Sequence, residues 1–126
     1  GARFRPRPLQ QPRIPIWVGG MWPHRPAFRR AARWDGVFPI AVDEHHDWAP
    51  MDPARYGEIL DYVRAHRTVD GPFDAAVGGG LIDHPDPPAV PACYAAIGAT
   101  WWIENVPFPS RPVEEFLSYV AAGPPR

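Results

Sequence analysis

The sequence contains no lysine, and this absence removes one class of chemistry. All 13 basic residues of the 126-residue chain are arginine. Schiff-base formation and lysine general-base catalysis therefore cannot come from this chain. The single cysteine, Cys93, excludes an internal disulfide framework and favours a reducing, cytoplasmic compartment. We expect Cys93 to be a small buried helix residue rather than a nucleophile.

Long apolar runs are also missing. No stretch approaches the roughly 18 residues that a membrane-spanning helix needs, and no signal peptide is visible, so we expect no membrane partner. Acidic residues are absent from residues 1–34, which carry eight arginines, whereas residues 35–126 carry five arginines and all 14 acids. This asymmetry favours an anionic ligand or an acidic partner surface. Without a basic-aromatic array it does not indicate nucleic acid.

Proline is abundant instead, at 19 of 126 residues, against a usual share of about 5%. Most prolines lie between periodic apolar segments, where they punctuate a folded chain. We expect one domain over residues 1–126, with residues 1–12 as an extended lead-in and 123–126 as a tail. Because the chain begins with Gly1, we expect it to be part of a longer protein.

Four short apolar segments are typical of strands buried on both faces, as in parallel sheets. They are Ile14–Val18, Gly36–Ile40, Phe73–Val77 and Trp101–Val106. A predicted helix follows each strand. These helices cover residues 26–34, a segment that begins at Asp52-Pro53, residues 88–97, and a segment from Val113 to the glycine at 123.

Alternation of strand and helix predicts an α/β fold of four βα units. Such an array forms either an open doubly wound sheet or a (β/α)8 barrel. A full barrel takes about 250 residues, so four units would be its C-terminal or N-terminal half. A half-barrel on its own exposes two sheet edges and therefore needs a partner or further chain.

Gly19 and Gly20 follow the first predicted strand, where ligands gather in both architectures. Glycine allows close backbone approach and frees N–H groups for an anion, and the start of the next helix adds its positive dipole end. A phosphate fits this position. The alternative is that the two glycines merely turn the chain, since the pair is neither a GxGxxG motif nor a P-loop.

Several segments of the chain resemble one family. "PRIPIWVGG", "RRAARWDGVFP", "FDAAVGG", "AAIGATWWIENV" and the terminal "GPPR" are similar to the C-terminal half of luciferase-like flavin-dependent oxidoreductases. The similarity covers nearly the whole chain from about Pro12. It implies half of a (β/α)8 barrel, a reduced FMN or deazaflavin F420 cofactor, and a small organic substrate. The implied reaction is monooxygenation with FMN or hydride transfer with F420.

The resemblance also implies a site for the cofactor phosphate. It implicates Gly19, Gly20, Met21 and Trp22, with His24 and Arg25 as further contacts. Relatives commonly carry small or hydroxyl residues where this chain has Met21-Trp22, so the phosphate would depend on backbone amides and arginine. The N-terminal half of the family, which supplies most catalytic side chains, is absent, and no catalytic residue is assigned.

Other clusters have plainer interpretations. The segment Asp43–Trp48, "DEHHDW", contains possible metal ligands, but its adjacent histidines would diverge on a strand, so we expect a solvated loop and no metal site. Residues 78–80, three glycines, end the third predicted strand. We expect one of Trp101 and Trp102 to face a barrel interior and the other to face helices. Glu104 would face the strand ends or pair with an arginine.

Three interpretations of the whole chain stay open. The first is a fragment of the oxidoreductase, completed by a missing N-terminal half or as a homo-oligomer. The second is a half-barrel module that pairs with a second chain and binds an anion without catalysis. The third is an enzyme of the same fold that uses a sugar phosphate.

Overall fold

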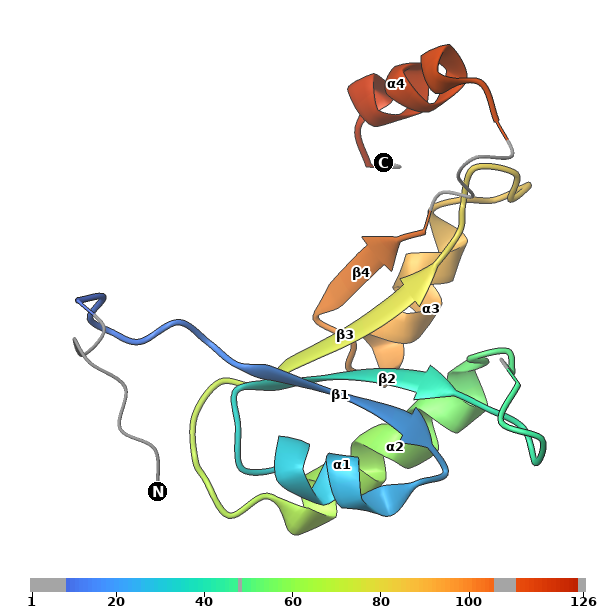
Figure 1. The fold of residues 1–126 in the computed structure, drawn as a ribbon. Coiled ribbons are helices and arrows are strands. Elements are labelled where there is room, and N and C mark those ends of the chain that lie inside the picture. Colours follow the sequence, from blue (N-terminus) through green and yellow to red (C-terminus); the bar gives the residue numbers. More distant parts are fainter. Residues whose placement is uncertain (1–8, 48, 106–110, 125–126) are drawn as a thin grey trace.

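The computed structural model describes residues 9–47, 49–105 and 111–124. Four strands alternate with four helices along the chain (Figure 1). The elements are β1 (Trp17–Trp22), α1 (Arg25–Ala31), β2 (Gly36–Ala41), α2 (Pro53–His66), β3 (Asp74–Gly79), α3 (Ala89–Ile97), β4 (Trp101–Glu104) and α4 (Val113–Ala122). The predicted α/β fold of four βα units is confirmed.

The four strands form one sheet in the order β1-β2-β3-β4, and every neighbouring pair is parallel. Helices α1, α2 and α3 lie on one face of this sheet, and α4 lies apart from it, beyond the end of β4 (Figure 1). A doubly wound sheet reverses its strand order and carries helices on both faces. The observed sequential order is consistent with a half-barrel.

The core lies between the sheet and helices α1 and α2. Phe28 of α1 and Tyr56, Ile59 and Val63 of α2 are completely buried, against Val37 of β2. The spacing of these α2 residues is the 3-4 pattern that places apolar side chains in one stripe along a helix. Asp52 caps α2 by accepting the N–H of Arg55, with Pro53 in the first turn.

The expected end of the first strand is wrong. We predicted Ile14–Val18, but β1 runs from Trp17 to Trp22 and includes both glycines. The earlier isoleucines lie outside the strand, and Ile14 is 65% exposed. Glycine weakens a strand without ending it when a neighbour supplies the ladder, and here β2 pairs with every residue of β1.

The pairing of β2 with β3 is short, because only Gly36 and Val37 pair with β3. Asp35 accepts the N–H of Asp74, so the odd-numbered residues of β2 face β3. Pro39 therefore points toward β3 at the position where the ladder needs its next N–H donor, and proline has none. The strands separate there, and a hollow of about 310 Å³ opens between them.

Three other expectations need comment. Helix α1 ends at Ala31, three residues before the predicted Trp34. Cys93 is exposed, because α3 turns Tyr94 toward the core instead. Helix α4 carries an apolar stripe made of Val113, Phe116, Leu117 and Val120, whose helical spacing favours burial. None of these side chains is buried, and Leu117 is 58% exposed.

The ends of the chain lie partly outside the described residues. Residues 9–12 form no helix or strand and are exposed, while residues 1–8 and 125–126 of the expected tails, and Val106 of the fourth predicted strand, lie outside the described residues. Among the helices of the described segments, none combines the length and apolar character needed to cross a bilayer.

Candidate functional site

Gly20 lies on the helix-covered face of β1 and allows α1 to approach. A Cβ at this position would come within 2.7 Å of the Ala27 Cβ and 3.2 Å of the Phe28 ring. Gly19 points to the opposite face, where a Cβ would meet only the Phe38 carbonyl oxygen, at 3.8 Å. The pair therefore neither turns the chain nor ends the strand. Gly20 serves strand–helix packing, and Gly19 leaves backbone exposed.

Trp22 and Arg25 lie on the same helix-covered side. Trp22 is buried and makes an edge contact with Phe28. The Arg25 guanidinium lies 4.6 Å from the Trp22 ring centre and 4.5 Å from that of Tyr62. Such stacking stabilises the turn after β1 and holds Arg25 against α2. These two predicted site residues are thus separated from the other four.

The other four predicted residues line one open hollow of about 760 Å³ along the outer edge of β1. Gly19, Gly20, Met21 and His24 contribute to it, together with Pro26, Ala27, Arg30 and Arg33 of the first helical segment and Ile40 of β2. Arg30 lies on α1 four residues after Pro26, and Arg33 lies three residues after Arg30 in the turn that follows the helix, so both reach the same side of α1 as Pro26. Within the described residues, neither guanidinium forms an ion pair.

The hollow therefore combines three features that suit an anion with an apolar body. Its walls carry two guanidinium groups and one imidazole, the exposed backbone of Gly19 and Met21, and apolar side chains. Guanidinium forks match phosphate oxygens bidentately. The N-terminal end of α1 adds little, because that helix has only seven residues.

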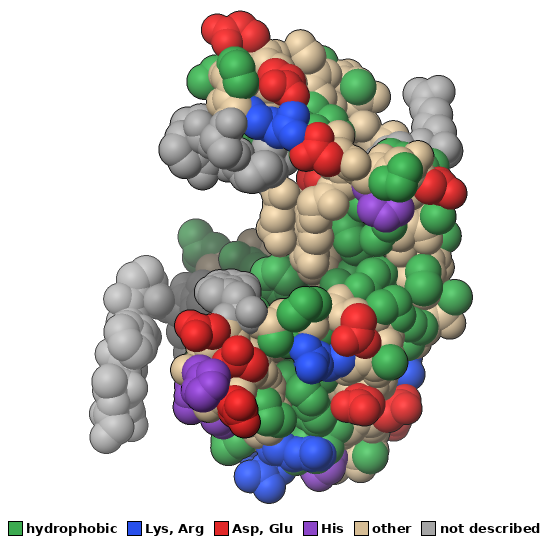
Figure 2. Space-filling view, turned by 90° about the vertical axis from the view of Figure 1, so that its right-hand side faces the viewer, with side chains coloured by type: hydrophobic (Ala, Val, Ile, Leu, Met, Phe, Trp, Pro, Cys, Tyr) green, Lys and Arg blue, Asp and Glu red, His purple; other side chains and the backbone are tan. Residues whose placement is uncertain are grey.

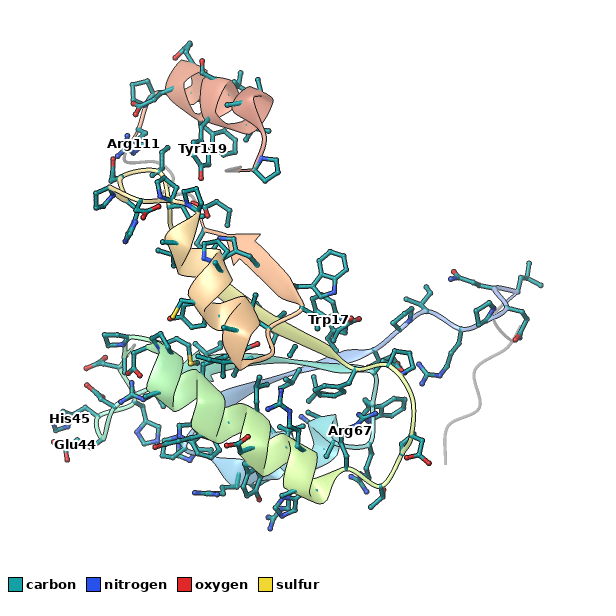
Figure 3. The ribbon with its side chains drawn as sticks, turned by 180° about the vertical axis from the view of Figure 1, so that it is seen from behind. Trp17, Glu44, His45, Arg67, Arg111 and Tyr119 are labelled. Carbon is teal, nitrogen blue, oxygen red and sulfur yellow. The ribbon has the colours of Figure 1, made fainter. Side chains whose placement is uncertain are left out.

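The loop after β2 meets the turn after β1. His46 stacks on His24 with ring centres 5.1 Å apart. Residues 43–47 are exposed, and the Asp43 carboxylate accepts the backbone N–H groups of His45 and Asp47. Figure 3 shows Glu44 and His45 pointing outward from this loop. The predicted solvated loop is confirmed for its described residues, and Trp48 lies outside them.

Metal-binding side chains do not converge in the described structure. No group of three histidine, cysteine, aspartate or glutamate side chains there is placed to hold an ion. Figure 2 looks along β1 and β2 toward their carboxyl ends, where histidines and acidic side chains gather on one side and arginines lie along the lower edge. Charges of opposite sign thus flank this end of the sheet.

A second hollow, of about 380 Å³, lies between β4 and α4. Glu104 lines it as the last residue of β4, accepting the N–H of Leu81 at 2.6 Å and the indole N–H of Trp102 at 2.9 Å. Tyr119 extends from α4 toward the sheet (Figure 3), and burial and the Glu104 carboxylate raise its pKa. Glu104 lies near the strand ends, as one alternative held, and forms no ion pair among the described contacts.

The face of the sheet opposite the helices is apolar and largely open. Trp101 lies there, 52% exposed, whereas Trp102 packs toward Tyr94 of α3. The two rings lie on opposite faces of the sheet and one of them faces a helix, as expected. Gly78 of β3 also lies on this face, where a Cβ would come within 2.9 Å of the Asn105 side chain and 3.4 Å of the Phe38 ring.

Sequence reasoning missed two features of this region. It left Arg30 and Arg33 unassigned, although their spacing from Pro26 placed them on one side of the helix. It also missed the His24–His46 stack, for which no local pattern exists, because the contact depends on how two loops meet.

Comparisons with family models, curated proteins and solved structures gave no match to this chain.

Proposed function

We propose that this chain is the C-terminal half of a (β/α)8 barrel of the luciferase-like type and that it holds the phosphate of FMN or F420. The observation that carries the proposal is the hollow beside β1, which joins Gly19, Met21 and His24 to Arg30 and Arg33. The sequence resemblance points to the same segment. The sequential parallel sheet supports the barrel, because each of the first three strands is followed by a helix on the same face.

The phosphate belongs at the His24 end of the hollow. That end lies at the carboxyl end of β1, where ligands bind in parallel α/β folds. Of Arg30 and Arg33, Arg30 is the closer to His24 along the chain, one turn beyond Pro26. Its guanidinium supplies a bidentate partner for two phosphate oxygens. Arg25 is held over Trp22 and Tyr62, so its charge acts from a distance.

A bound reduced flavin supplies oxygen activation, and a bound F420 supplies hydride transfer. This chain's part is to bind and orient the cofactor and to exclude water from one side of it. Apolar groups near the hollow, Met21 and Ile40, suit the flat body of such a cofactor. No catalytic side chain is assigned to this chain.

The proposal is tested by titrating the purified protein with FMN and with F420 and following cofactor fluorescence. Removing one guanidinium–phosphate contact costs about 1.5–3 kcal/mol, so Arg30→Ala should weaken binding by about tenfold or more. Arg29→Ala is the matched control, because Arg29 lies on the same helix but does not line the hollow. Equal effects of the two substitutions would place the phosphate elsewhere.

A second candidate is a half-barrel module without catalysis. The open apolar face and the two free strand edges favour it, since these surfaces serve association rather than chemistry. A protein that associates but retains neither FMN nor F420 at high concentration would support this module and reject the oxidoreductase.

A further inference from the structure

We propose that two copies of this chain close their sheets into one barrel, with β1 of each copy pairing with β4 of the other. The inference goes beyond the cofactor site and does not depend on it. It identifies the missing half of the barrel as a second copy of the same chain. Three features carry it: the free backbone groups of the two edges, the open apolar face, and the surface area.

The outer edge of β1 carries unpaired backbone groups. Trp22 accepts the N–H of Val42 and Ile16 accepts that of Asp35, so the even-numbered residues face β2. Trp17, Gly19 and Met21 consequently direct their N–H and C=O groups outward. Within the described contacts, only the Met21 carbonyl is used, by the N–H of His24.

The outer edge of β4 is the counterpart. Asn105 donates its N–H to Gly79 of β3 in register with the ladder, so the residues that alternate with it, Trp102 and Glu104, direct their backbone groups outward. Exposed edges of this kind are sites of strand pairing. Both edges belong to parallel strands, so β4 of one copy can extend the sheet beyond β1 of the other in the same direction.

The open face supplies the apolar surface that such closure buries. Met21 is 48% exposed and Trp101 is 52% exposed, and Trp17 lies on the same face of β1 as Met21. Parallel sheets occur almost only with both faces covered. Helices α1 to α3 cover one face here, and within the described chain no element covers the other (Figure 1).

The surface area is large enough for a stable dimer. The chain exposes 9121 Å², whereas a compact monomer of 14.1 kDa exposes about 6,700 Å². Part of this excess belongs to the exposed residues 9–12. Obligate dimers bury roughly 2,000 Å² or more in total, which two such chains can supply from their open faces and edges.

A second copy fits better than an unrelated partner because one chain presents both edges. A two-fold axis along the barrel places β4 of each copy beside β1 of the other, so a single symmetry operation satisfies both edges. Closure then leaves no free edge. Pairing takes up the outward backbone groups of Gly19 and Met21, so in the dimer an anion in the hollow beside β1 would rely on His24, Arg30 and Arg33.

The test is the mass of the full chain in solution, measured by light scattering and native mass spectrometry. We expect about twice 14.1 kDa at micromolar concentration, because closure buries both free edges. Met21→Lys places a charge on the open face beside the β1 edge and should yield a monomer. The matched control is Val69→Lys in the loop before β3, since Val69 is 49% exposed and Met21 is 48% exposed. This control should stay dimeric.

Two further variants keep the test decisive. If Met21→Lys misfolds by circular dichroism, Gly19→Lys replaces it, because a Cβ there meets only a carbonyl oxygen at 3.8 Å. Ile103→Glu should also give a monomer, and mixing it with Met21→Lys should restore a dimer through one charge-paired edge and one native edge.

A monomeric wild-type chain, an open-ended assembly, or a dimer that survives Met21→Lys would each overturn the proposal. Failure of a mixture of the Met21→Lys and Ile103→Glu chains to form a dimer would also overturn the proposal. None of these measurements needs a cofactor, so failure of the flavin site and failure of the closure are separate results.

Discussion

The indole rings of Trp17 and Trp101, from the two outer strands of the sheet, lie 5.5 Å apart. Both donate their ring N–H to the carboxylate of Asp74 on β3, at 2.9 and 3.1 Å. Trp17 reaches Asp74 across Gly36 of β2, where a Cβ would meet the Trp17 ring at 2.6 Å. Side chains from three strands therefore meet over a glycine on the open face, as large and small residues alternate inside small barrels.

Trp17→Phe tests this contact. The ring's apolar surface stays, but Asp74 loses one of its two indole donors, and an unpaired part-buried acceptor costs about 1–3 kcal/mol of unfolding free energy. Urea unfolding gives the value. Trp34→Phe is the control, because Trp34 is 37% exposed and its ring N–H has no partner among the described contacts. A smaller loss for Trp17→Phe than for Trp34→Phe would contradict the assigned role.

The two glycines of β1 should respond differently to a methyl group. Gly20→Ala forces a Cβ to within 2.7 Å of Ala27, and overpacking of this kind costs about 1–3 kcal/mol. Gly19→Ala meets open space and should leave the free energy of unfolding unchanged or slightly higher. Unfolding of both variants in guanidinium chloride measures the two changes in the free energy of unfolding. Equal losses would show that Gly20 has no special packing role.

Tyr56 and Tyr94 form a second matched pair, with ring centres 5.5 Å apart. The Tyr56 hydroxyl is buried without a partner among the described atoms, and burial raises its pKa. Tyr56→Phe should therefore be neutral or stabilise the fold. Tyr94→Phe removes a donor to the Met51 carbonyl and should cost about 1 kcal/mol. Thermal unfolding distinguishes them, and a large loss for Tyr56→Phe would show that its hydroxyl does have a partner.

Asp52 makes the fold sensitive to acid. Its carboxylate accepts the N–H of Arg55, which lowers its pKa from the ordinary value. A lowered folded-state pKa gives stability that is present above about pH 4 and is lost as the pH falls through the folded-state value. Asp52→Asn keeps the cap without the charge, so its unfolding midpoint should change less between pH 5 and 2 than that of the wild type. Equal pH profiles would exclude this carboxylate as the cause.

Local patterns predicted most of the fold. Asp52-Pro53 and Gly123 marked helix ends that the structure contains, because capping and positive φ angles are properties of single residues. The end of β1 was predicted wrongly, because a pair of glycines is typical of a turn. In the structure, the ladder to β2 keeps the pair extended, and that ladder is a long-range contact that the local sequence does not indicate. The exposure of Cys93 was missed for a similar reason, since Tyr94 takes the inward position.

The candidate site was predictable only in part. Four of the six implicated residues meet in one hollow, because they follow one another along β1 and its turn. Trp22 and Arg25 do not join them, since strand alternation and stacking on Tyr62 send both to the helix side. Arg30 and Arg33 also line the hollow, because they lie four and seven residues after Pro26, which is close to one and two turns of a helix. Their approach to β1 depends on the close packing that Gly20 permits.

The most direct measurement of the proposed cofactor site compares ligands with and without their phosphate. Purified protein is titrated with FMN and riboflavin, and with F420 and its phosphate-free chromophore, by fluorescence. We predict that one phosphate-bearing cofactor binds at least about tenfold more tightly than its counterpart, because the guanidinium contact requires the phosphate. That preference should fall in Arg30→Ala and persist in Arg29→Ala. Equal affinity for both members of each pair, or binding of neither cofactor, would contradict the proposed phosphate site.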